Sequence, residues 1–240
     1  MTDVATKAPQ LLLYAMFDPE RTDAGTLRDV FDMSGVQDQP IRSIPGKDLS
    51  VLASPVEDSS VISSPSMGEV LAFKRVVDTA FQGGPLIPLR FGTLVRSNGQ
   101  AEIVLQEKGH LYADLLGRLD GQAEMGICLS LKSEGNGEND RIPSYRGDRP
   151  GTAYLLARQQ SLVRERQRAE ALVAPFREAL GSLATSVSTS PRHDAEESVS
   201  IAFLVPRKNV DRFREIAGEV SVPAARSVEV VGPWAPYSFV

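Results

Sequence analysis

The sequence has few of the side chains that bind metals or form disulfides. Of its 240 residues, one is cysteine and two are histidine. A single cysteine forms no disulfide within the chain, which is typical of proteins from a reducing cytoplasm. His110 and His193 lie far apart in the sequence without zinc-ligand spacing, and Cys128 has no second cysteine near it. We therefore expect neither a metal nor a cofactor.

Long hydrophobic runs and an excess of positive charge are also missing. The longest early apolar run, from Leu11 to Phe17, is far shorter than the ~20 residues that a membrane span needs. No basic stretch precedes it and no A-x-A cleavage site follows it, so we expect no secretory signal. With 26 Lys and Arg against 31 Asp and Glu, the net charge is −5. Such a chain does not attract nucleic acid or anionic lipid, and we expect a cytoplasmic protein.

Motifs for catalysis are absent as well. The tripeptide Gly46-Lys47-Asp48 lacks the first glycine and the Ser or Thr of a phosphate loop, and a surface turn is the better interpretation. No G-x-S-x-G nucleophile motif is present. The arginines between positions 158 and 168 have the spacing of a solvated helix face, except Arg166. Arg166 falls within the apolar stripe, where we expect it to pair with a carboxylate at an interface or to extend to solvent. These features favour a protein that is not an enzyme.

The first half of the chain predicts an alternation of strands and helices. Residues 1–9 carry no periodicity, and we expect them to be disordered. Apolar patterns and turn residues then predict, in order, a strand at 11–17, a helix at 22–33, strands at 41–44 and 49–54, a loop at 56–66, a helix at 67–81 and a strand at 86–91. Helical spacing places Val70, Phe73, Val77 and Phe81 on one buried face.

The second half repeats this order with an insertion. A helix begins after Ser97 and ends at Gly121, and residues 123–131 alternate as a half-buried strand. We expect a linker at 133–150 and a long helix at about 151–183, in which Pro175 causes a kink or starts a second helix. A strand at 199–205, a helix capped by Asn209 and a last strand around Val228 and Val230 follow.

This element order predicts an α+β fold with two ferredoxin-like (βαββαβ-type) domains, each with an antiparallel sheet. The N-terminal domain covers residues 10–92 and the C-terminal domain residues 93–240, where the long helix is an added element. The second domain takes its first strand from residues 89–95.

Three segments resemble the gas vesicle protein family of the GvpL/GvpF type. The first is residues 84–93, Gly-Pro-Leu-Ile-Pro-Leu-Arg-Phe-Gly-Thr, and the second is residues 151–155, Gly-Thr-Ala-Tyr-Leu. The third is the ending at residues 232–239, Gly-Pro-Trp-Ala-Pro-Tyr-Ser-Phe. Their order and separations also match, so the resemblance covers nearly the whole chain from Leu11. The family positions carried here are Pro88, Arg90, Phe91, Gly92, Tyr154, Trp234, Tyr237 and Phe239.

The resemblance implies an accessory or minor structural protein that is required to assemble gas vesicles, the gas-filled protein shells that give cells buoyancy. Members are similar in being non-enzymatic and in binding the small hydrophobic shell protein, and other accessory proteins are further partners. The resemblance also implies that the protein is located in the cytoplasm and at the gas vesicle. A function from another class remains open: ferredoxin-like sheets also bind small molecules between domains as regulatory modules.

The aromatic ending of the chain has two interpretations. Trp234, Tyr237 and Phe239 either contact the shell protein, together with the exposed side of the long helix, or pack back on their own sheet. In the segment at 84–93 we expect Arg90 in a hydrogen-bonded network between the domains, and Gly92 at a close approach of backbone.

Overall fold

The computed structural model describes residues 10–131, 159, 163, 167, 169–191, 198–223 and 225–240. Its contacts divide the chain into two compact units. Unit 1 combines Met1–Glu124 with Trp234–Val240, and unit 2 is Met125–Pro233. The chain therefore leaves unit 1 after Glu124 and returns to it at Trp234. We call Trp234–Val240 the return segment.

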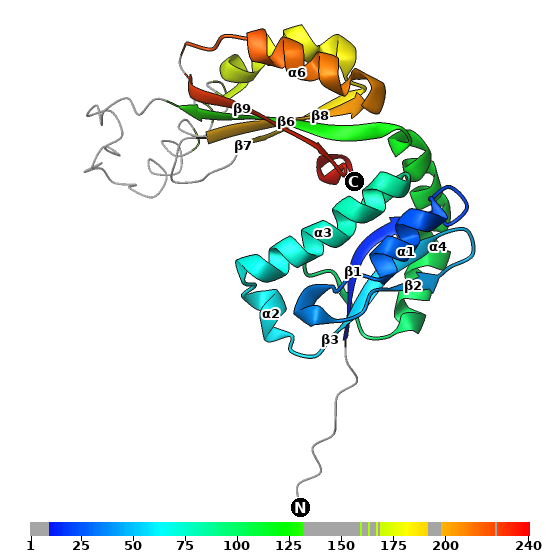
Figure 1. Ribbon diagram of the computed structural model, residues 1–240. Coiled ribbons are helices and arrows are strands. Elements are labelled where there is room, and N and C mark those ends of the chain that lie inside the picture. Colours follow the sequence, from blue (N-terminus) through cyan, green and yellow to red (C-terminus); the bar gives the residue numbers. More distant parts are fainter. Residues whose placement is uncertain are drawn as a thin grey trace, which may run out of the picture. The chain divides into compact units, whose positions relative to one another are not determined.

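Unit 1 is built on one antiparallel sheet (Figure 1). Its strands lie in the order β2-β3-β1-β4, and β5 pairs with β1 beside β4. The elements are β1 (Gln10–Phe17), α1 (Ala24–Phe31), β2 (Arg42–Pro45), β3 (Ser50–Val56), α2 (Ser60–Ser63), α3 (Met67–Gly83), β4 (Leu86–Pro88), β5 (Leu94–Val95) and α4 (Asn98–Leu119).

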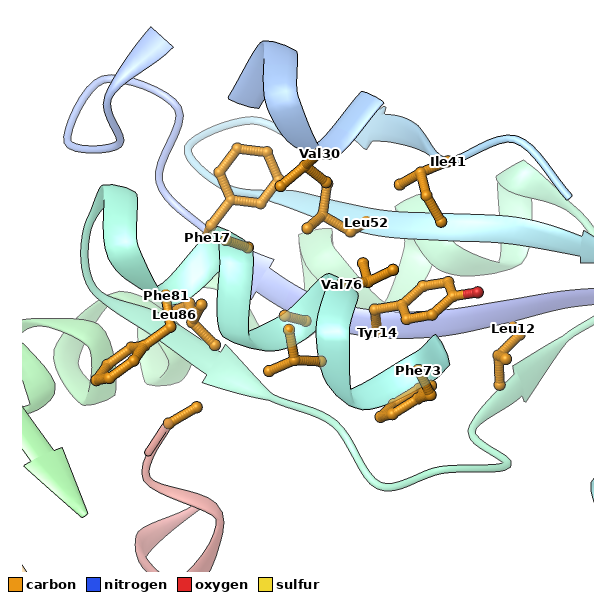
Figure 2. Close-up of a cluster of buried hydrophobic side chains, with 14 of the residues drawn as sticks. Leu12, Tyr14, Phe17, Val30, Ile41, Leu52, Phe73, Val76, Phe81 and Leu86 are labelled. Carbon is orange, nitrogen blue, oxygen red and sulfur yellow. The ribbon is translucent and has the colours of Figure 1, made fainter. Parts of the chain in front are cut away.

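Strand β1 is the centre of this unit because it is buried along both faces. Residues Leu11–Phe17 are all buried, although alternate side chains of a strand point to opposite faces. Helices α1 and α3 pack together over one face, and α4 contacts β2, β4 and β5. The core on the α1 and α3 side includes Leu12, Tyr14, Phe17, Val30, Ile41, Leu52, Phe73, Val76, Phe81 and Leu86 (Figure 2).

Local sequence explains where the helices on this face begin. The Asp23 carboxylate accepts a hydrogen bond from the Thr26 backbone N–H at 2.7 Å and caps α1. Ser66 and Glu69 form a reciprocal capping box at the start of α3. In it, the Ser66 N–H donates to the Glu69 carboxylate at 2.7 Å and the Glu69 N–H donates to Ser66 Oγ at 3.3 Å.

Unit 2 has a second sheet with strand order β7-β8-β6-β9. Its strands are β6 (Gln122–Leu131), which begins in unit 1, β7 (Ser186–Pro191), β8 (Ser198–Pro206) and β9 (Ala225–Trp234). Residues 169–180 are helical and lie between β6 and β7 in the chain, and α6 (Val210–Glu219) lies between β8 and β9. Both helices cover the same face of the sheet in Figure 1. Counted along each unit, the strands of both sheets lie in the order second, third, first, fourth.

Most of the predicted elements are confirmed, with several corrections. A short helix, α2, lies inside the predicted loop at 56–66, and β4 ends at Pro88. Val70 is 39% exposed, so the buried face of α3 is formed by Phe73, Val76, Val77, Ala80 and Phe81. Strand β7 was not predicted at all.

The helix in unit 2 also differs from the prediction. Residues 169–180 continue through Pro175 without a new helix beginning there, and residues 181–183 form a 3₁₀ turn. The helix is the first crossover of the repeated element order and not an added element, because it takes the place that α1 has in unit 1. Asn209 precedes α6 but makes no side-chain cap, and its amide donates to the Leu183 carbonyl at 3.4 Å. The predicted linker at 133–150 lies outside the described residues.

The division between the units also differs from the boundary placed after residue 92. Helix α4 and strand β5 belong to unit 1 because they pack on its sheet. The first strand of unit 2 is therefore β6 and not residues 89–95.

Candidate interaction surface

The return segment is packed into unit 1. Ala235 is fully buried and belongs to the same core cluster as Tyr14 and Phe73, and Tyr237 packs against that cluster. Pro236 is also buried, whereas Trp234 remains 38% exposed and Phe239 is half-buried. The middle of the segment thus completes a core, while the Trp234 ring lies partly in solvent.

Glu124 holds the return segment through two hydrogen bonds. Its carboxylate is buried, with 8% of the residue exposed. It accepts one hydrogen bond from the Ser238 backbone N–H at 2.7 Å and another from the Ser238 hydroxyl at 2.8 Å. Burial raises the pKa of the Glu124 carboxyl because it disfavours the charged form, and the two bonds from Ser238 oppose this shift. The two residues are 114 positions apart in the chain, so this contact is purely tertiary.

Two charged residues of α3 flank the return segment. The Lys74 ammonium lies 5.5 Å from the centroid of the Trp234 ring, within the range of a cation–π contact. Lys74 also forms an ion pair with Asp78, one helical turn further along α3. The pKa of the Tyr237 hydroxyl is raised mainly by burial and further by the negative charges of Asp78 and Glu124. Tyr237 is therefore a neutral group in this surface at physiological pH.

The segment at 84–93 follows β1 as an interrupted edge of the sheet. The Leu89 N–H donates to the Tyr14 carbonyl at 2.9 Å, and the Leu13 N–H donates to the Thr93 carbonyl at 2.9 Å. Between these two bonds the chain forms a turn. The Thr93 N–H and hydroxyl close this turn by donating to the Arg90 carbonyl at 3.1 and 2.8 Å. This turn separates β4 from β5.

The predicted site residues in and beside this turn do not converge on one site. Pro88 is buried at the end of β4, and the Arg90 side chain is exposed. Phe91 packs edge-on against Phe73, with 5.3 Å between the ring centroids. Gly92 has a φ of +90°, a conformation that favours glycine, and a Cβ there would lie 3.1 Å from Ile62 Cγ2. The segment is thus a local structural feature of unit 1.

Tyr14 links this edge to the core, as Figure 2 shows for its ring beside Phe73. The two rings are stacked with their centroids 4.9 Å apart. The Tyr14 hydroxyl accepts a hydrogen bond from the Val36 N–H at 2.9 Å and lies 2.8 Å from Ser54 Oγ. Burial raises the pKa of this hydroxyl. It is a satisfied core group without access to solvent.

A row of exposed apolar side chains lies on α3 near the return segment. Met67 is 73% exposed, Leu71 is 53% exposed and Val70 is 39% exposed. We call Met67, Val70, Leu71 and Trp234 the α3 stripe. Sequence patterns alone do not identify Glu124 or Lys74 as neighbours of the return segment. The sequence does contain a signal that Met67 and Leu71 are exposed, because helical spacing places them on the side of α3 opposite the buried Phe73 and Val76.

Two of the predicted site residues, Tyr154 and Arg166, lie outside the described residues. Among the residues that the structure does describe, no helix combines the length and the apolar character needed to cross a bilayer. In that same part of the chain, no three His, Cys, Asp or Glu side chains are grouped so that they could hold a metal ion.

A comparison with known protein families identifies the family of this chain. The family described as gas vesicle synthesis protein GvpL/GvpF matches residues 10–240, which include both units and the return segment. The chain belongs to the GvpL/GvpF family. The resemblance of the three sequence segments is thereby confirmed.

Two curated relatives come from a Streptomyces species. Gas vesicle protein L is 29% identical over 164 residues, which is 64% of this chain and 61% of that protein. Gas vesicle protein F is 28% identical over 224 residues, which is 87% of this chain and 92% of that protein. This GvpL/GvpF protein is therefore similar to both types.

Solved structures of GvpF share the fold. The chain matches GvpF from Anabaena sp. with a TM-score of 0.70 and 21% identity, over 96% of this chain and 95% of the other. It matches GvpF from Microcystis aeruginosa with a TM-score of 0.68 and 21% identity, over 96% and 98% of the two chains. The mixed helix and antiparallel-sheet fold of this GvpL/GvpF protein is thus that of GvpF.

Proposed function

We propose that this GvpL/GvpF protein is an assembly factor that binds the small hydrophobic shell protein of gas vesicles and keeps it from aggregating before it enters the shell. The observation that carries the proposal is the family match over residues 10–240. On this proposal the protein works in the cytoplasm and at the growing vesicle, together with other accessory proteins.

The physical requirement of such a shell supports this role. A wall that keeps liquid water out of a gas space needs subunits with large apolar surfaces, and such subunits aggregate unless they are covered. A protein that covers them needs exposed apolar groups more than a catalytic pocket. Met67, Leu71 and Trp234 are exposed apolar groups of this kind.

We also infer that each unit is a ferredoxin-like layer. The support is the element order β-α-β-β-α-β together with the shared strand order of the two sheets. In unit 1 the pairings of β1 with β3 and β4, and of β2 with β3, are all antiparallel, as that layer requires.

Co-purification with the shell protein tests the proposed function. The full chain, carrying an affinity tag, is produced together with the shell protein, and the captured shell protein is quantified. In a parallel experiment the gene is deleted from a vesicle-forming host and buoyancy is measured. We expect capture by the full chain and loss of vesicles on deletion. Normal vesicles without this chain would remove the assembly role, and absence of capture would remove the binding step.

A further inference from the structure

The α3 stripe consists of exposed apolar side chains of α3 and the partly exposed Trp234 ring, which Lys74 contacts. Met67, Leu71, Lys74 and Asp78 follow one another at spacings of four, three and four residues, so they lie on one side of α3. Val70 lies one turn before Lys74, and the Lys74 ammonium contacts the Trp234 ring. From Met67 to Asp78 the row is ~16 Å long, or about three helical turns. Such a ridge fits the groove of another helix.

On this side of α3 the Lys74 ammonium forms an ion pair with the Asp78 carboxylate. Arg75 is exposed, lies one turn after Leu71, and has no ion-pair partner among the described residues. In the part of the chain that the structure describes, the border of this row therefore carries one positive charge, Arg75, without an ion-pair partner.

This charge distinguishes between possible occupants. A second copy that docked through its own α3 would bring no free carboxylate from that helix, because Glu69 is engaged in the capping box and Asp78 pairs with Lys74. A helix with an apolar face and a carboxylate at its border would cover Met67 and Leu71 and also pair with Arg75. Charge complementarity thus favours a different protein over the pairing of two α3 helices from two copies.

We propose that the α3 stripe with Arg75 is the docking surface for an amphipathic helix whose apolar face is bordered by a carboxylate. This inference rests on the proposed function, in which that helix belongs to the shell protein. Trp234 is the aromatic anchor at one end of the surface, because large aromatic side chains dominate the binding energy of such contacts. Arg75 orients the incoming helix.

A pair of matched leucine variants tests the docking surface in the full chain. Leu71 is 53% exposed on α3 and Leu111 is 55% exposed on α4, so Leu71→Glu and Leu111→Glu place the same charge at equally exposed helical positions. Both variants should keep the melting temperature of the parent. We expect Leu71→Glu to reduce capture of the shell protein at least about tenfold, as for a residue at the centre of an interface. Leu111→Glu should capture as the parent does.

The charge is tested in the same assay. Arg75→Glu should weaken capture several-fold, and its exposed counterpart on α4, Arg118→Glu, should not. Capture by the parent should also decrease with added salt more steeply than capture by Arg75→Gln.

The outcomes separate this inference from the proposed function. If the parent captures shell protein and Leu71→Glu captures it equally well, the α3 stripe is not the docking surface, although the assembly role stands. Equal losses for Leu71→Glu and Leu111→Glu would also overturn it. If the parent elutes as a dimer that Leu71→Glu dissociates while capture is unchanged, the stripe joins two copies and the inference is wrong. No capture by the parent removes the binding step of the proposed function, and this inference with it.

Discussion

At the residue scale, Glu124 is a carboxylate that the fold buries where the return segment supplies two donors. Its side chain accepts from the Ser238 N–H and hydroxyl, and burial still raises its pKa above the ordinary value. A carboxyl whose pKa is raised on folding binds more protons in the folded state than in the unfolded state. Its contribution to stability is therefore complete in acid and decreases as the pH rises through the raised pKa.

Replacing this carboxylate by an amide isolates its titration. Glu124→Gln keeps an acceptor for Ser238 but does not ionise. We expect the free energy of unfolding of the parent, relative to Glu124→Gln, to fall as the pH is raised from about 4 to about 8. Urea unfolding at a series of pH values measures this difference, with the exposed Glu102→Gln on α4 as the control. A relative stability that increases with pH would show that the two hydrogen bonds from Ser238 outweigh burial and lower the pKa of this carboxyl.

The aromatic residues of the return segment allow a test of their two interpretations. Trp234→Ala and Phe239→Ala should weaken capture of the shell protein and leave the melting temperature nearly unchanged. For Trp234 the reason is that its ring is 38% exposed and its contact with Lys74 is worth only about 0.5–1 kcal/mol. Calorimetry and the capture assay check this.

The control for Trp234 is another exposed aromatic side chain of unit 1. Phe31 on α1 is also 38% exposed, and Phe31→Ala should not affect capture. A large fall in melting temperature for Trp234→Ala or Phe239→Ala would show that the rings act mainly in internal packing.

At the scale of elements, the turn between β4 and β5 depends on Gly92. Its φ of +90° and the closeness of Ile62 both disfavour a side chain there. We expect Gly92→Ala to destabilise the protein by about 1–2 kcal/mol. Chemical unfolding measures the change. Gly117→Ala in α4, where a Cβ meets no atom within 4 Å, should instead stabilise by roughly 0.5–1 kcal/mol.

The elements also show how far the sequence could predict the fold. The continuous apolar run of β1 and the alternation of Met125, Ile127 and Leu129 in β6 identify buried strands without further information. Strand β7 has serine or threonine at four of its six positions, and it forms because β8 pairs with it. Its own pattern carries no strand signal, since tertiary pairing overrides local preference.

The candidate interaction surface was harder to predict than the strands, because it too depends on tertiary contacts. The sequence identifies Trp234 and Tyr237 as large groups near one another, but their surroundings depend on Glu124 and Lys74, more than a hundred positions earlier. The assignment of α4 to unit 1 likewise follows from packing and not from the order of elements.

At the scale of the whole molecule, unit 1 is formed from two separate parts of the chain. A protein shortened after Pro233 loses Ala235 and Tyr237 from the core of unit 1 and leaves Glu124 without its two donors. We expect such a truncation to destabilise unit 1 by at least about 2 kcal/mol. Faster hydrogen exchange of the amides in β1 and α3 would report it. Removal of Val240 alone, which is 48% exposed, is the control and should leave exchange unchanged.

The order of synthesis follows from the same two-part construction. When a ribosome has made residues 1–124, all five strands of the first sheet have been translated, but the segment that buries Glu124 has not. All of unit 2 must be translated before Trp234–Val240 can close that site. The first unit to emerge is therefore the last to be finished, and during translation its open core is a target for chaperones.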